Sequence, residues 1–183
     1  MSNSTHIILA LCMGVLIGLT SCTKEDDLTI PNNQSQEIGK YETKAGKSNI
    51  NKLVAQVRQA TVQYHDYQAA LDDGFFNTED CVSNPDGEGA MGVHFVRFDR
   101  LDDVHNPLEP EVLVYELRNN GTYKLVAVEY LHVGDTAPMF GGEVEFHPFS
   151  LPFADYELHL WLWKANPDGQ FTDWNPNVSC PTE

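Results

Sequence analysis

Residues 111–132 read EVLVYELR-NNG-TYKLVAVEYLH and decide the fold. Two runs rich in Val, Leu and Tyr flank Asn119-Asn120-Gly121, and Asn-Gly as a two-residue type I′ turn is a strong signal for a β-hairpin. That turn would fix three cross-strand pairs, which are Glu116 with Leu125, Val114 with Ala127, and Val112 with Glu129. Both faces of this hairpin are apolar, which predicts burial on both sides. A three-residue loop would instead shift the register by one residue and separate the two glutamates.

Further strand-like segments surround the hairpin, rich in Val, Tyr, Phe and Trp and separated by Gly, Pro and Asn. They are Met91–Phe98, Glu143–His147 and Asp155–Lys164. Before them, apolar residues recur at spacings of three and four from Ile50 to Asp73, which predicts an amphipathic helix capped at Ser48 or Asn49 and ended by Gly74. The sequence therefore predicts an α+β fold, with one long N-terminal helix packed on a curved antiparallel sheet or a small barrel.

The N-terminus carries the features of an export signal. Residues 6–19 form an uncharged apolar run that is short for a membrane span and typical of a signal-peptide core. The run ends in Leu19-Thr20-Ser21-Cys22, which resembles the lipobox of bacterial lipoproteins. This resemblance implies that Cys22 is acylated with fatty chains such as palmitate and anchors the protein in a lipid bilayer.

The residues after Cys22 refine the expected location and organisation. The acidic cluster Glu25-Asp26-Asp27 resembles the surface-export signal of Bacteroidota lipoproteins, which implies an outer-membrane protein facing the periplasm or the exterior. Residues 23 to about 48 are polar without an apolar period, as in a flexible linker. We expect a signal peptide over 1–21, the lipidated cysteine and a tether over 22–48, and a single globular domain over 49–183.

Charge and cysteine content constrain the class of protein. The chain of 183 residues has 11 Lys and Arg against 27 Asp and Glu, a net charge of −16, which argues against nucleic acid as a partner. Of the four cysteines, Cys12 leaves with the signal peptide and Cys22 takes the lipid. In an oxidising compartment the remaining two, Cys81 and Cys180, are expected to form a disulfide, with free thiols or a metal site as the alternatives.

Four polar residues on apolar strands are candidates for chemistry: His94, Glu116, Glu129 and His159. A carboxylate on a buried face needs a partner, and two histidines with one carboxylate can hold a divalent transition metal. Glu116 and Glu129 are about 13 Å apart along the strand, so only one of them is expected to join His94 and His159. Alternatively, these side chains satisfy buried backbone groups or one another. His105, His132 and His147 are expected to be solvated at strand ends or loops.

The tryptophans offer a second hypothesis. Trp161, Trp163 and Trp174 lie near the C-terminus, and strand alternation places Trp161 and Trp163 on the His159 face. Exposed, they would form a platform for a glycan or a protein partner; buried, they belong to the core.

Several segments together resemble a family of uncharacterised exported bacterial proteins. They are Gly89–His94, Pro110–Glu116, Val128–Tyr130, Leu158–Trp163 and Trp174–Cys180. The resemblance implies one secreted domain with His94, Glu116, Glu129 and His159 among its motif positions, and it implies no activity. The resulting hypothesis is a lipid-anchored exported protein that binds a metal ion or a small ligand in a β pocket, with the glycan- or protein-binding module as the alternative.

Overall fold

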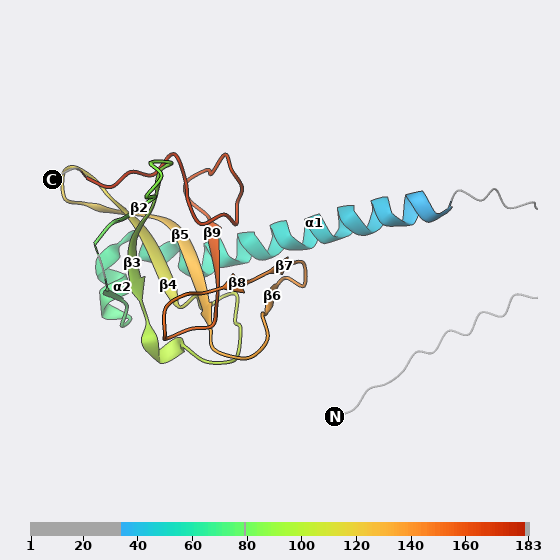
Figure 1. Ribbon diagram of the computed structural model, residues 1–183, viewed down its shortest axis with the longest axis horizontal. Helices are drawn as coiled ribbons and strands as arrows, with labels where there is room; N and C mark the ends of the chain where they lie inside the picture. The colour runs from blue at the N-terminus through green and yellow to red at the C-terminus, as the bar shows by residue number, and fades with distance from the viewer. Residues whose placement is uncertain (1–33, 79, 182–183) are drawn as a thin grey trace, which may run out of the picture.

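The computed structural model describes residues 34–78 and 80–181, and for 34–46 it describes the backbone alone. The fold is α+β, with one long helix, α1 (Gln34–Thr61), lying across a mostly antiparallel sheet and extending beyond it (Figure 1). Among the described residues, no helix is both long and apolar enough to cross a membrane. The predicted signal peptide, the lipobox with Cys22 and the acidic cluster all lie outside the described residues.

The helical region differs from the single predicted helix over Ile50–Asp73. Helix α1 starts at Gln34, so Ser48 and Asn49 lie within it, and part of the expected tether is helical. A 3-10 turn, η1 (Val62–His65), and a short helix, α2 (Tyr67–Asp72), follow α1. The interruption is at Asp66, whose backbone is extended and whose carboxylate accepts a hydrogen bond from the Gln68 N–H as the cap of α2.

Gly74 ends the helical region as predicted. Its N–H donates to the Leu71 carbonyl, and the Phe75 N–H donates to the Ala70 carbonyl. These two bonds satisfy carbonyl groups at the end of α2 in the Schellman pattern. The chain then enters the sheet.

The main sheet has the strand order β1-β3-β4-β5-β9-β8, with every pairing antiparallel. The strands are β1 (Phe76–Asn77), β2 (Val82–Ser83), β3 (Ala90–Val96), β4 (Val112–Leu117), β5 (Tyr123–His132), β6 (Met139–Phe140), β7 (Val144–Glu145), β8 (His147–Pro148) and β9 (Tyr156–Trp161). Strand β2 also pairs with β3, and β6 and β7 form a separate small sheet. The edges β1 and β8 do not pair, so the sheet is open; of the two predicted forms, the antiparallel sheet is present and the small barrel is wrong.

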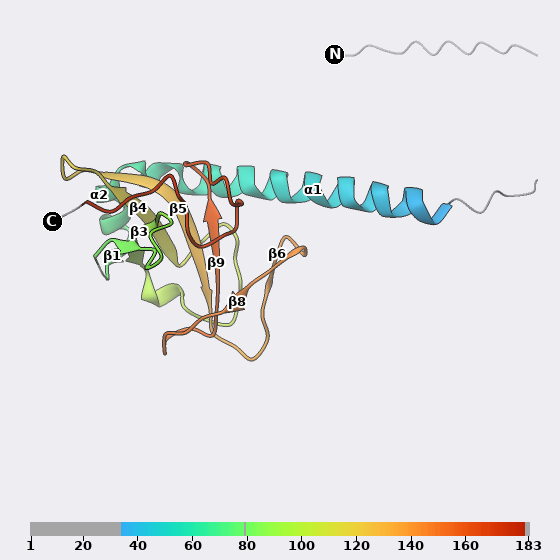
Figure 2. The same ribbon diagram turned by 45° about the horizontal axis from the view of Figure 1, so that its top comes forward.

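Two clusters of buried side chains lie on opposite faces of the sheet. The helix-side cluster joins α1 to the sheet, and it includes Ile50, Val54, Val57, Leu113, Tyr115, Leu125, Val128 and Tyr130. The opposite cluster, on the face away from α1, includes Val96, Val112, Val114, Val126, Ala127, Leu131 and Trp161. Both faces of the β4–β5 hairpin are therefore buried, as its sequence predicts. Figure 2 shows α1 along one side of the sheet only.

The hairpin register is confirmed at one end and wrong at the other. Val112 opposes Glu129 and Val114 opposes Ala127, but Glu116 opposes Lys124 and not Leu125. The Arg118 N–H donates to the Thr122 carbonyl, so the loop has three residues and shifts the register by one. A bulge at Val126 then restores the predicted pairing.

The C-terminal segment is tied to the rest of the domain at two points. Cys81 and Cys180 form the predicted disulfide, 99 residues apart in sequence. Ala90 and Asn175 exchange two backbone hydrogen bonds of 3.3 and 3.2 Å as an isolated bridge. Together these contacts hold the residues after β9 against the start of β3.

Candidate metal centre

Three predicted ligands come together from three strands. His94 lies on β3, Glu129 on β5 and His159 on β9. Glu129 and His159 are direct cross-strand partners, while His94 opposes Val114 in the neighbouring row. Because paired residues share a face, all three side chains point away from α1. Side chains alternate between the two faces along each strand, so these three polar side chains lie on the same face as the apolar residues of the cluster opposite α1.

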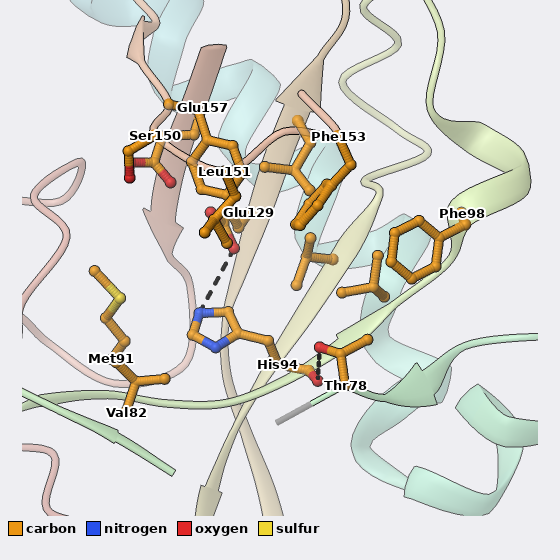
Figure 3. Close-up of a pocket in the computed structure, with 14 residues that line it drawn as sticks. Thr78, Val82, Met91, His94, Phe98, Glu129, Ser150, Leu151, Phe153 and Glu157 are labelled. Atoms are coloured by element: carbon orange, nitrogen blue, oxygen red, sulfur yellow. Dashed lines mark hydrogen bonds and ion pairs between the residues drawn. The ribbon is translucent and has the colours of Figure 1, made fainter. Parts of the chain in front are cut away.

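The three side chains are buried and close. Glu129 Oε2 lies 3.6 Å from His94 Nε2 (Figure 3), and Glu129 Oε1 lies 3.9 Å from His159 Nδ1. One ligand atom from each residue lies within 4.8 Å of the others. His94 and Glu129 are about 5% exposed and His159 is fully buried. The arrangement is a pre-formed group of two imidazoles and one carboxylate.

His159 is held in the neutral state. Burial lowers the pKa of His159 well below its usual range, with the nearby His94 and His147 acting in the same direction. Neither ring nitrogen has a hydrogen-bond partner among the described residues. A neutral imidazole with a lone pair is the form that binds a metal ion.

A second group of ligand-type residues, which the sequence analysis missed, adjoins the first. His147 Nε2 lies 3.0 Å from Asp173 Oδ1, and His147 Nδ1 lies 3.5 Å from Glu157 Oε1. Glu157 is two residues before His159 on β9, on the same face, and it opposes His147 on the edge strand β8. His147 was expected to be solvated at a strand end or loop; its side chain is 39% exposed on the two-residue strand β8, and it also contacts these two carboxylates.

Asp173 belongs to the loop after β9 and not to a strand. The Trp161 indole N–H donates to the Thr172 carbonyl at 2.6 Å, and the Trp161 backbone N–H donates to the Gln170 carbonyl. These bonds fold the loop back over β9 and bring Asp173 Oδ1 to 3.7 Å from His159 Nδ1. Trp161 is therefore a positioning residue for the Asp173 carboxylate.

A cavity of about 400 Å³ opens beside the first group. His94, Glu129 and Glu157 supply its polar wall, and apolar side chains, including those of Phe98 and Phe153, supply much of the remainder (Figure 3). Burial raises the pKa of Glu157 above its usual range, an effect opposed by a hydrogen bond that its carboxylate accepts from Glu129. An apolar pocket with a few converging polar groups is the usual form of a small-molecule site.

Glu116, the fourth predicted ligand, lies elsewhere. Its carboxylate pairs with the Lys164 ammonium group and it opposes Lys124 near the hairpin turn. Glu116 therefore follows the alternative given in the sequence analysis for such residues, in which a polar side chain on a strand pairs with another protein group and binds no metal ion. Two other histidines also differ from expectation: His132 is buried, and His105 packs against Tyr130 and Phe146 with its Nε2 atom buried.

The three tryptophans do not form a shared platform. Trp161 is buried in the cluster opposite α1, whereas Trp163 packs on the helix side beside His65. Trp174 lies in the loop after β9, next to Asp173. The expectation that Trp161 and Trp163 share a face is wrong, because β9 ends at Trp161 and both Leu162 and Trp163 donate to the Val126 carbonyl.

Comparison with known proteins supplies no function. No protein-family model, curated protein or solved structure matches the chain. The function is therefore inferred from the chemistry of the site.

Proposed function

We propose that this domain binds a divalent transition-metal ion through His94, Glu129 and His159. The observation that carries the proposal is the convergence of these three side chains from three different strands, with one ligand atom of each within 4.8 Å of the others. Two histidines and a carboxylate are a ligand set used for zinc and for non-haem iron. Each ligand is on a strand and not in a flexible loop, which favours a defined coordination geometry.

The distances fit such an ion with small adjustments. Ligand atoms around a tetrahedral zinc ion are about 3.3 Å apart when each bond is about 2.0–2.1 Å long. The observed separations from the Glu129 oxygens to His94 and His159 are 3.6 and 3.9 Å. A side-chain rotation would bring the atoms together, and the neighbouring cavity leaves room for a water or a small ligand on the ion.

The proposal places the metal-binding domain on a membrane surface outside the cytoplasm. The lipobox resemblance at Cys22 supports a lipid anchor in the outer membrane. The Cys81–Cys180 disulfide supports an oxidising compartment. Small molecules that reach the cavity beside Glu129 are the expected ligands of the bound ion.

Metal titration of the full chain, purified without a histidine tag, tests the proposal. In competition with a chromophoric chelator, the wild-type chain should bind at least one equivalent of Zn²⁺. Removing one ligand in Glu129→Gln should weaken binding at this site at least about tenfold. Glu116→Gln is the matched control, because it removes a strand carboxylate that is paired with Lys164, and it should leave zinc affinity unchanged.

Two outcomes would overturn the proposal. One is less than about a tenth of an equivalent of Zn²⁺, Co²⁺ or Cu²⁺ bound to the folded wild-type chain. The other is an equal loss of affinity in Glu129→Gln and Glu116→Gln, which would mean that binding follows total charge and not this site.

A further inference from the structure

The second ligand group, His147, Glu157 and Asp173, has the composition of a metal site in its own right. One ligand atom of each residue lies within 4.8 Å of the others. The three residues come from β8, β9 and the loop after β9, and their side chains are partly exposed. A hollow of about 430 Å³ reaches His147 and Asp173 from the side of that loop. An ion would thus have a route to these residues that does not pass through the cavity beside His94.

The two ligand groups are contiguous. Glu157 and His159 are neighbours on one face of β9, and Asp173 Oδ1 lies 3.0 Å from His147 Nε2 and 3.7 Å from His159 Nδ1. The Asp173 carboxylate therefore stands between the two groups. A carboxylate in this place could contribute one oxygen to each of two ions, as in two-metal sites whose ions are about 3.5–4 Å apart.

The charge balance favours a cation. Within the described ranges 34–78 and 80–181, Glu157 and Asp173 have no Lys or Arg ion-pair partner, and the basic groups that they approach are the imidazoles of His147 and His159. His159, which is fully buried and has no hydrogen bond to a described residue, directs Nδ1 at Asp173. Two neighbouring carboxylates of intermediate burial whose basic partners are histidines alone are stabilised by coordination to a metal ion.

We propose that His147, Glu157 and Asp173 hold a second divalent metal ion beside the first, with the Asp173 carboxylate shared between the two. The pairing of ions rests on the proposed function of His94, Glu129 and His159, whereas the second site by itself does not. The centre is then dinuclear, with one side facing the apolar cavity and the other facing the loop after β9.

Stoichiometry of the full chain tests the pairing. Calorimetric titration and elemental analysis should give two equivalents of Zn²⁺ for the wild-type chain and one for His147→Ala or for His94→Ala. Asp173→Asn, which keeps the shape of the side chain, should lower the affinity of the chain for both Zn²⁺ ions. His65→Ala is the control, because His65 contacts Trp163 away from both groups, and it should retain two equivalents.

A spectroscopic readout distinguishes adjacent ions from separate ones. With two equivalents of Cu²⁺, the wild-type chain should give an electron paramagnetic resonance spectrum that is broadened or reduced by coupling between the ions. His147→Ala with one equivalent should give the spectrum of an isolated Cu²⁺. Circular dichroism of each variant shows whether it has folded, and Glu157→Gln, which removes a ligand of the second group alone, replaces His147→Ala if the latter does not fold.

The outcomes separate this inference from the proposed function. One equivalent that is lost in His94→Ala and kept in His147→Ala overturns the second ion and leaves the first. One equivalent that is kept in His94→Ala and lost in His147→Ala overturns the pairing and the proposed first site. Two equivalents without magnetic coupling overturn the shared Asp173 carboxylate, and no binding by the wild-type chain overturns both proposals.

Discussion

Glu129 and His159 face each other across the β5–β9 ladder, with Glu129 Oε1 3.9 Å from His159 Nδ1. Both side chains are buried in the middle of a sheet whose surroundings are apolar. An imidazole without a hydrogen bond in such a place opposes folding, because its polar atoms lose their contacts with water. The arrangement is a stability cost that a bound ion would offset.

Replacing His159 by leucine should therefore separate stability from metal binding. For metal-free His159→Leu, we expect a free energy of unfolding equal to that of the wild type or about 1–2 kcal/mol higher. The reason is that the substitution removes a buried polar group that has no hydrogen bond to a described residue. The stabilisation by added Zn²⁺ should disappear at the same time. Urea unfolding with EDTA and with zinc measures both effects. A loss above about 2 kcal/mol without metal would assign His159 a packing role.

The carboxyl group of Glu111 predicts a fall in stability as the pH rises from about 4.5 to about 7. Burial raises the pKa of Glu111 to about 7 from 4.5, although its carboxylate accepts a hydrogen bond from the Leu131 N–H and lies near Arg100; Asp102 adds to the rise. The folded state thus holds the proton more tightly than the unfolded chain. This stabilisation is complete below pH 4.5 and is lost as the pH rises through 7, by up to about 3 kcal/mol.

The variant Glu111→Gln tests that dependence. It should unfold with a free energy that changes less between pH 5 and pH 8.5 than that of the wild-type chain, because the titrating group is gone. Glu143→Gln removes an exposed carboxylate and should keep the wild-type profile. Parallel profiles for Glu111→Gln and the wild type would contradict the prediction.

Gly89 allows the contact between the C-terminal segment and β3. A Cβ atom at Gly89 would lie 2.2 Å from the Asn175 carbonyl oxygen, whereas one at Gly87 would meet nothing within 4 Å. The two residues have similar positive φ angles of 85° and 82°. Gly87→Ala should cost about 1 kcal/mol, and Gly89→Ala at least about 2 kcal/mol more, because the loop that carries Asp173 must move. If urea unfolding shows equal losses of stability for Gly87→Ala and Gly89→Ala, the loop moves without a cost in free energy and the prediction is wrong.

The disulfide should contribute strongly to stability. Cys81–Cys180 closes a loop with a sequence separation of 99 residues, and such cross-links restrict the unfolded chain. We expect the double variant Cys81→Ser, Cys180→Ser to lose about 2–5 kcal/mol in urea unfolding. The wild-type chain in reducing agent should show a similar loss. A variant as stable as the oxidised wild type would refute the prediction.

Strand alternation made the first ligand group predictable, and local irregularity hid the second. His94, Glu129 and His159 stand out as polar residues at inward positions of strands that are otherwise apolar. His147 lies on a strand of only two residues, and Asp173 lies in a loop, so neither has a periodic pattern around it. Asp173 reaches the site through the bonds from Trp161 to the loop backbone, which depend on the folded chain.

The same limit explains the errors in the fold. The pattern of apolar residues in Ile50–Asp73 continues through Asp66, although the backbone turns there and starts a new helix. An open sheet and a barrel have the same alternation along each strand, so strand patterns alone could not choose between them. The hairpin turn offered two loop lengths, and only the observed pairing of Leu117 with Tyr123 decides for the longer one.

The bulge at Val126 separates Glu129, a ligand of the proposed metal site, from the tip of the hairpin. A slip of the tip by one residue would exchange Leu125 and Val126 between the two faces and would stop at the bulge, leaving Glu129 opposite Val112. The exposed residues of the tip, 118–122, are separated from Glu129 by this bulge. The hairpin tip is therefore a suitable place for a label or an inserted peptide that is meant to leave the proposed metal site undisturbed.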